Sequence, residues 1–323
     1  MGVLLLGLVP AALDRHHQEQ AVWPTLIAVG DVMLGREVAE AARTHGPDYP
    51  FAALNLRALA PRSAPYIIFG NLECPICRPG QPLDKPIVFR TPPDSAFTLR
   101  RAGFAVLCLA NNHSLDQGRL GLTETLEHLT AAGVCPVGAG ATAEEARRLV
   151  IINRGLRIGF LAYSTLPTEQ LFPAANQPSV AKWDPLESVR DIKAARHRCD
   201  VLVVSMHWGQ EGSYAASAFQ RETARQISEA GAALILGHHP HAPQEIETIG
   251  RTLVAYSLGN YVFDDHGVFD GASNRANEGL VLQVQLGSDG WHSLSYRHVR
   301  PRAGQAREAL PPRRQGGKRE SAG

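Results

Sequence analysis

Seven side chains that suit a divalent metal ion follow short apolar runs of this sequence. They are Asp31, Glu73, Asn112, His113, His207, His239 and His241. Together they offer carboxylate, amide and imidazole groups without a thiolate, which is the ligand set of Mn, Zn, Fe or Mg at a hydrolytic centre. Any one of them could instead be a turn cap or a hydrogen-bonded core residue. The hypothesis of a metal site rests on the repetition of the pattern.

The sharpest part of the pattern is His239-Pro240-His241. Residues two apart in extended backbone face the same side, so both imidazoles can address one ion. By the same alternation, His238 is expected to point the other way and to play a supporting or structural part.

The runs that precede these residues are four to six residues long, rich in Val, Ile and Leu, and flanked by Gly or Pro. Such runs predict buried strands. They span 26–29, 66–69, 105–109, 201–205, 233–236 and 253–257. The polar residues therefore stand at strand carboxyl ends, where ligands collect in α/β proteins. We expect residues far apart in sequence to converge there.

Helical signals lie between the predicted strands. Asp184-Pro185-Leu186-Glu187 is a capping box with proline at the first helical position, and it opens an amphipathic stretch to about His197. Similar stretches cover 121–132 and 219–230, and 157–164 is a further apolar run. Residues 166–183, with three prolines, are predicted to form a long surface loop or lid.

Composition excludes little beyond a nucleic-acid footprint. The chain has 323 residues, with 32 basic and 31 acidic side chains and a net charge of +1. No nucleic-acid partner is expected from this balance. Five cysteines, including Cys74 and Cys77, form no disulfide framework in a chain of this length, and one CxxC pair is weak evidence for zinc.

Three segments are predicted along the chain. Residues 1–24 are a leader or disordered N-terminus, 25–300 one α/β domain, and 301–323 a disordered basic tail. The apolar stretch 1–13 lacks a basic n-region and is too short to cross a bilayer, so there is no clear signal peptide or transmembrane helix. A cytoplasmic and a membrane-associated or exported location both stay open.

Read with their flanking residues, the polar clusters resemble the motifs of the CapA family. These are bacterial capsule or poly-γ-glutamate biosynthesis proteins within the calcineurin-like metallophosphatase superfamily. The resemblance covers roughly residues 25–300 and is carried by Gly30-Asp31-Val32-Met33-Leu34-Gly35-Arg36, Asn71-Leu72-Glu73, Ala110-Asn111-Asn112-His113, His207-Trp208-Gly209-Gln210-Glu211, Gly237-His238-His239-Pro240-His241, and Ser257-Leu258-Gly259-Asn260 with Phe263-Asp264. It implies a four-layer α/β/β/α sandwich with the metal site among the loops between two sheets.

The resemblance also implies roles for single residues. The metal-binding positions are matched by Asp31, Asn112, His207, His239 and His241, and His113 matches the residue that protonates the leaving group. The family pattern has a bridging aspartate where this chain has Asn71, with Glu73 as the nearest carboxylate. One or two ions are therefore expected. Possible supporting or substrate-binding residues are Asn71, Arg36, Glu211 and Asn260, and Arg90 is a further candidate for anion recognition.

Met33 stands where the superfamily pattern has a histidine. On extended backbone it would face the same side as Asp31. A histidine introduced there is therefore expected to reach the same ion and to raise the metal content.

Three functional classes fit these features. The first is a metal-dependent hydrolase or transferase that acts on a phosphoester or an anionic polymer. The second is a non-catalytic accessory factor that binds the polymer within the machinery of capsule synthesis or export. The third is a metal-stabilised scaffold unconnected with any polymer.

Overall fold

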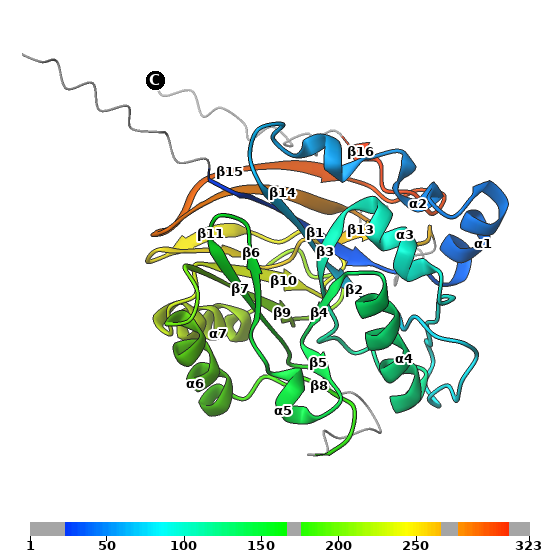
Figure 1. The fold of residues 1–323 in the computed structure, drawn as a ribbon, viewed down its shortest axis with the longest axis horizontal. Coiled ribbons are helices and arrows are strands. Elements are labelled where there is room, and N and C mark those ends of the chain that lie inside the picture. Colours follow the sequence, from blue (N-terminus) through cyan, green and yellow to red (C-terminus); the bar gives the residue numbers. More distant parts are fainter. Residues whose placement is uncertain (1–22, 167–175, 266–276, 310–323) are drawn as a thin grey trace, which may run out of the picture.

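All six apolar runs form strands in the computed structural model, which describes residues 23–166, 176–265 and 277–309 (Figure 1). These strands are β1 (Thr25–Val32), β2 (Tyr66–Leu72), β3 (Phe104–Cys108), β9 (Val201–His207), β10 (Leu234–His238) and β12 (Thr252–Ala255). The first three pair in parallel in one sheet, and the last three pair in parallel in another. The prediction of buried strands is confirmed at every run.

The protein is a mixed α/β protein with two mixed sheets. The larger sheet has the order β16-β15-β14-β1-β2-β3-β4, with β13 also paired to β1, and the smaller has the order β11-β12-β10-β9-β7-β6. A two-stranded sheet joins β5 to β8. The remaining strands are β4 (Cys135–Val137), β5 (Ala139–Gly140), β6 (Val150–Asn153), β7 (Arg157–Ser164), β8 (Ser179–Val180), β11 (Ile246–Ile249), β13 (Asn260–Val262), β14 (Gly279–Gly287), β15 (Gly290–Val299) and β16 (Glu308–Ala309).

The predicted helices are present within a few residues of their expected bounds. In α6 (Pro185–Arg196), the Asp184 side chain accepts hydrogen bonds from the backbone nitrogens of Leu186 and Glu187, which confirms the N-cap. The reciprocal half of the predicted capping box is wrong, because the Asp184 backbone nitrogen donates to Ser188 Oγ at 3.0 Å instead of to Glu187. The other helices are α1 (Arg36–His45), α2 (Tyr49–Ala52), a 3-10 helix (Leu56–Leu59), α3 (Ser95–Ala102), α4 (Gly118–Ala131), α5 (Ala143–Ala146) and α7 (Ala218–Glu229).

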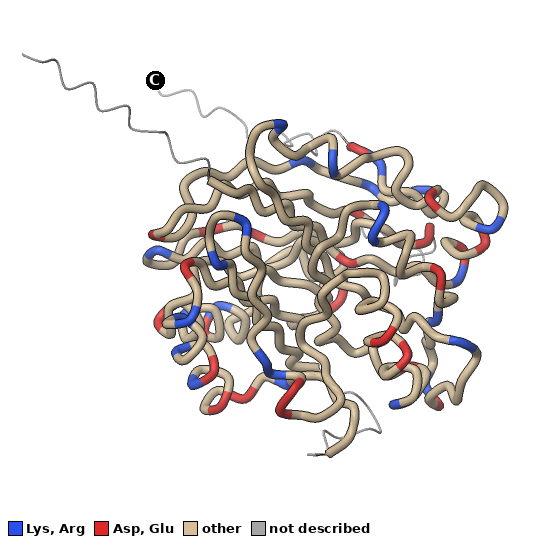
Figure 2. The backbone as a smooth tube through the Cα atoms, in the orientation of Figure 1, with Lys and Arg blue, Asp and Glu red and all other residues tan. Residues whose placement is uncertain are grey.

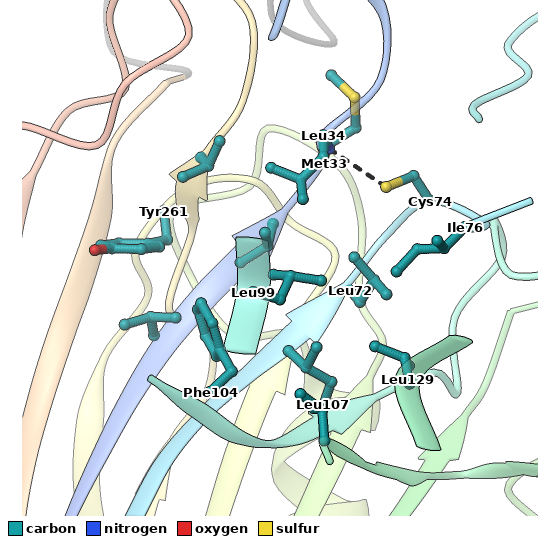
Figure 3. Close-up of a cluster of buried hydrophobic side chains, with 14 of the residues drawn as sticks. Met33, Leu34, Leu72, Cys74, Ile76, Leu99, Phe104, Leu107, Leu129 and Tyr261 are labelled. Carbon is teal, nitrogen blue, oxygen red and sulfur yellow. Dashed lines mark hydrogen bonds between the residues drawn. The ribbon is translucent and has the colours of Figure 1, made fainter. Parts of the chain in front are cut away.

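Three buried apolar clusters pack the two sheets against each other and against the helices. Alternate residues of the two sheets meet in the central cluster, where the Phe69 and Phe160 rings stack with centroids 5.7 Å apart. The opposite face of the larger sheet packs on α3 and α4, with Leu99, Phe104 and Leu129 among its members (Figure 3). The outer face of the smaller sheet packs on α6 and α7. Burial of alternate faces explains why the central strands read as continuous apolar runs.

The domain extends beyond the predicted boundary at residue 300. Residues 301–309 fall in the predicted basic tail, but β16 pairs with β15, and Ala306 is buried. Pairing with a sheet edge is a tertiary contact that composition cannot reveal. Residues 310–323 and 1–22 lie outside the described residues, and so do residues 167–175 of the predicted loop.

The five cysteines are free, as expected, and four of them are buried. Basic and acidic residues are interspersed over the described part of the chain (Figure 2). None of the helices in the described segments has the length and apolar character that a membrane span requires.

Candidate metal centre

The strand registers bring the predicted site residues together. Asp31 at the end of β1 is level with Asn71 on β2 and with Asn260 on β13. His207 at the end of β9 is level with His238 at the end of β10. Parallel strands end at the same edge of a sheet, so each sheet carries its polar residues to one edge. Contacts between β1 and β10 then join the two edges.

Asp31 is the centre of the first group of contacts and is fully buried. Its Oδ1 accepts a hydrogen bond from Asn71 Nδ2 at 2.8 Å and lies 3.3 Å from His238 Nδ1. Its Oδ2 lies 3.3 Å from His241 Nδ1. His238 was predicted to point away, but the structure places it beside this carboxylate. It lies on the face of β10 that Leu234 and Leu236 turn toward the larger sheet, and its ring centroid lies 6.2 Å from that of Phe69.

Glu73 is the second buried carboxylate. Both of its oxygens lack a hydrogen-bond donor within the described part of the chain. Oε1 lies 3.6 Å from His207 Nε2 and 3.8 Å from His241 Nε2. A buried carboxylate without donors carries a large desolvation cost, which a cation would offset.

His239 and His241 approach each other by a route that the sequence did not predict. Both have positive φ angles, of 96° and 55°, so the proposed extended backbone is wrong here. Their ring centroids are nevertheless 6.0 Å apart. Non-glycine residues in the left-handed region cost about 1–3 kcal/mol each and concentrate at ligand sites. The strained turn, rather than strand alternation, brings the two rings to one place.

Asn112 and His207 connect the two sheets. Asn112 Oδ1 lies 2.8 Å from His207 Nε2, and His207 Nδ1 lies 3.4 Å from Asn71 Nδ2. Asn111, which had no predicted role, donates to Asn71 Oδ1 at 3.1 Å and accepts from the His113 backbone nitrogen at 3.0 Å. Asn111 therefore fixes the loop that carries Asn112 and His113.

Among the described residues, three groups of side chains could hold a divalent ion, and each has ligand atoms within 4.8 Å of one another. They are Glu73 with His207 and His239, Glu211 with His239 and His241, and Asp31 with Glu73 and His241. Asn71, Asn112 and Asn260 contact members of these groups, and Asn260 Oδ1 is 2.8 Å from His241 Nδ1. Arg36 instead pairs with Asp264. Glu73, His239 and His241 each belong to two of these groups, and the Glu73 oxygens have no hydrogen-bond donor among the described residues. This set of nitrogen and oxygen ligands fits one or two divalent cations.

The electrostatics favour a positive charge between the two carboxylates. Burial and the charge of Asp31 raise the pKa of Glu73 well above its usual value. Burial lowers the pKa of His241, but Glu73 and Asp31 outweigh it and raise this pKa to about 10. Burial and the neighbouring histidines lower the pKa of His207 well below its usual value and that of His239 to about 3. Both rings therefore stay neutral, which is the form that binds metal.

His113 belongs to none of the three groups. It is part of a separate series of polar contacts that runs through Asp116 to Lys85. His113 Nδ1 lies 2.8 Å from Asp116 Oδ2, and Asp116 Oδ1 is 2.6 Å from Lys85 Nζ. Only 4% of the Lys85 side chain and none of the Asp116 side chain is exposed. The spacing of Asp116 three residues after His113 was a signal that could have identified it from the sequence. Lys85 carried no signal of its own.

We expect Asp116→Asn to lower the free energy of unfolding by about 3–5 kcal/mol, because it leaves Lys85 charged, buried and unpaired. Urea denaturation followed by circular dichroism measures this loss. The double variant Lys85→Met with Asp116→Asn should recover part of it, since no unpaired charge remains. A single variant with an unchanged midpoint would contradict the role of this ion pair.

Met33 does not take the place of a metal ligand. Its side chain is fully buried in the cluster that packs on α3 and α4, and its sulfur accepts a hydrogen bond from the Gly35 backbone nitrogen at 3.1 Å (Figure 3). The backbone register shifts between Asp31 and Val32, so the alternation that would align Met33 with Asp31 is broken. The prediction that residue 33 faces the same side as Asp31 assumed an extended backbone, and it does not apply here.

We therefore expect Met33→His to leave the metal content unchanged and to lower the free energy of unfolding by about 1–3 kcal/mol, the cost of burying an unpaired polar group. Elemental analysis and urea denaturation measure the two quantities. Met33→Leu keeps the volume and should cost less than about 1.5 kcal/mol. A rise in bound metal in the histidine variant would restore the original expectation.

Comparison with known proteins places this arrangement in a family. Residues 25–265 match the family described as bacterial capsule synthesis protein PGA_cap. The chain is 32% identical over 266 residues to the PGA biosynthesis protein CapA of Bacillus subtilis (strain 168), covering 81% of this chain and 67% of the relative. It is 30% identical over 287 residues to the capsule biosynthesis protein CapA of Bacillus anthracis, covering 85% of this chain and 66% of that relative.

A third relative, a probable polyglutamine synthesis accessory protein of Mycobacterium tuberculosis, is 34% identical over 211 residues, covering 61% of this chain and 56% of the relative. The chain thus spans about two thirds of the length of the Bacillus relatives and 56% of the length of the Mycobacterium tuberculosis relative. A hypothetical protein from Thermus thermophilus shares the fold, with a TM-score of 0.50, 15% identity, and coverage of 86% of this chain and 99% of that chain. With the family matched over residues 25–265, this chain belongs to the bacterial capsule synthesis protein family PGA_cap.

Proposed function

We propose that this protein is a metal-dependent hydrolase or transferase of capsule or poly-γ-glutamate biosynthesis, acting on a phosphoester or on the anionic polymer. The observation that carries the proposal is Glu73, whose buried oxygens lack donors in the described chain and face His207 and His241. On this proposal the two sheets and their outer helices are the four-layer α/β/β/α sandwich of the metallophosphatase type.

The proposed ligands for one or two ions of Mn, Zn, Fe or Mg are Asp31, Glu73, Asn112, His207, His239 and His241, with Glu211 beside the last two. When bound, a divalent cation supplies Lewis-acid polarisation and lowers the pKa of water. Asn71 donates to Asp31, and Asn260 lies against His241, so both orient proposed ligands.

His113 is the proposed proton carrier. In its neutral form Nδ1–H donates to Asp116, which leaves a lone pair on Nε2. His113 would therefore take up a proton at Nε2 and deliver it to a leaving group. Asp116 holds the ring in that tautomer, and Lys85 holds Asp116 in place.

The second candidate is a non-catalytic accessory factor that binds the polymer within the capsule-synthesis machinery. The name of the Mycobacterium tuberculosis relative, an accessory protein, favours it. In this case the same centre would bind metal and polymer without turnover.

Metal analysis combined with turnover separates the candidates. The purified full chain would be supplied with Mn, Zn or Mg in turn and assayed on an aryl phosphodiester and on poly-γ-glutamate. Turnover of either substrate, dependent on metal, supports the enzyme. Stoichiometric metal and tight polymer binding without turnover support the accessory factor, and metal without either supports a scaffold. A metal at 100 times its Kd should also add about 2.7 kcal/mol to the free energy of unfolding.

A further inference from the structure

Glu211 differs from the other members of the three candidate metal groups in where the chain places it. The others are buried and stand at the carboxyl ends of β1, β2, β9 and β10 or in the turn just beyond them. Glu211 is partly exposed and lies in the loop 208–217, which leads from β9 to α7. Strands hold side chains more firmly than loops do, so the position of Glu211 depends on what fixes this loop.

The first half of the loop rests on the turn that carries the two histidines. The Gly212 backbone nitrogen donates to the carbonyl of Pro240 at 2.8 Å, and Pro240 stands between His239 and His241. Ligand atoms of Glu211 and both histidines lie within 4.8 Å of one another. Because Gly212 follows Glu211 directly, this hydrogen bond keeps the Glu211 side chain beside both rings.

A buried glutamine holds the second half of the loop. Gln244 Nε2 donates to the carbonyls of Ser213 and Ala215 at 2.9 and 3.2 Å. Gln244 Oε1 accepts a hydrogen bond from Gln220 Nε2 at 2.9 Å. These bonds use both N–H donors and the oxygen of the Gln244 amide. A buried amide loses free energy when its partners are removed, so the Gln244 side chain fixes the path of the loop backbone.

Gln220 in turn fixes Gln244. Gln220 Oε1 accepts from the Ser217 backbone nitrogen at 2.9 Å, and the Gln220 backbone nitrogen donates to Ser217 Oγ at 3.2 Å, which forms the capping box of α7. The loop backbone at Gly209 packs on the same amide, since a Cβ at this position would lie 2.9 Å from Gln220 Cδ. The loop is therefore tied through two glutamines to α7, which packs on the smaller sheet (Figure 1).

We propose that Gln244 is a positioning residue of the metal centre, which holds the loop 208–217 so that Glu211 joins His239 and His241 in binding the ion. The proposal rests on the proposed function, since it takes these side chains to bind a divalent cation. Gln244 contacts the backbone of the loop, so its effect on the ion passes through Glu211. Groups that orient metal ligands typically change metal affinity by about 10- to 100-fold.

Titration of the purified full chain with Mn tests the proposal, with free Mn measured by electron paramagnetic resonance. Gln244→Met keeps the length of the side chain but removes its hydrogen bonds, and it should weaken Mn binding about 10-fold. Glu211→Gln should weaken binding at least as much. The double variant should bind Mn as Glu211→Gln does, because a residue that acts through Glu211 has nothing left to position. Gln226→Met, which changes a glutamine of α7 that contacts Glu222, is the matched control and should bind as the parent does.

Hydrogen exchange without metal measures the loop itself. Gln244→Met should raise the exchange rate of the Gly212 amide about 10-fold and leave the amides of β9 and β10 unchanged, since loops open separately from core strands. Should Gln244→Met fail to fold, Gly212→Ala replaces it in both experiments, because alanine at the φ of 73° found at Gly212 is strained and displaces the same loop.

The positioning role is wrong if Gln244→Met binds Mn as tightly as Gln226→Met does, or if the losses of the two single variants simply add in the double variant. Unchanged affinity in Glu211→Gln alongside weakened affinity in Asp31→Asn would overturn the inference and leave the metal centre standing. Mn binding that depends on Gln244 through Glu211, without turnover of either substrate, would instead refute the catalytic function and support the inference.

Discussion

Alanine in place of His113 is expected to lower turnover by about 10²- to 10⁴-fold, the usual contribution of a positioned proton donor or acceptor. The substrate is whichever of the aryl phosphodiester and poly-γ-glutamate the parent protein turns over. The metal content should stay unchanged, because His113 is hydrogen-bonded to Asp116 and belongs to none of the three candidate metal groups. Turnover under saturating metal and elemental analysis of the same preparation measure the two effects.

His128→Ala is the control for this variant. His128 lies on α4 with 30% of its side chain exposed and pairs with Glu124 at 4.0 Å, away from the centre. It should alter neither turnover nor metal content. A His113→Ala protein that loses metal would make His113 a ligand, and one that keeps full turnover would remove it from the proposed chemistry.

The second large effect is expected for Asp31→Asn. Asparagine keeps the size of Asp31 but removes the negative charge that faces His238 and His241 at 3.3 Å. We expect metal affinity to fall by about 100-fold or more, since changes to groups that merely orient ligands already cost 10- to 100-fold. Turnover should fall with the metal content, and titration with Mn or Zn measures the affinity directly.

Asp289→Asn controls for the loss of one carboxylate, because its side chain is 63% exposed and distant in the fold. This variant should bind metal as the parent does. Circular dichroism establishes that Asp31→Asn remains folded before its affinity is compared. An Asp31→Asn protein with the same number of ions per chain would exclude Asp31 as a required ligand.

Much of the fold follows from local sequence. Apolar runs of four to six residues bounded by Gly or Pro are strands in all six cases, because burial on both faces demands uninterrupted apolar residues. The N-cap of α6 was equally readable, since Asp184 satisfies backbone nitrogens only two and three residues away. The tail boundary was not readable, because β16 exists only through pairing with β15.

For the candidate site, the sequence by itself determined which chemistry is present and that it stands at strand ends. Tertiary structure decided how the groups meet. A register shift beside Asp31 sends Met33 into the core, and left-handed backbone at His239 and His241 replaces the expected alternation. The contact of Asp116 with Lys85 joins residues 31 positions apart, which no local pattern specifies. Local periodicity encodes burial, whereas bulges, strained turns and buried ion pairs arise only when the two sheets pack.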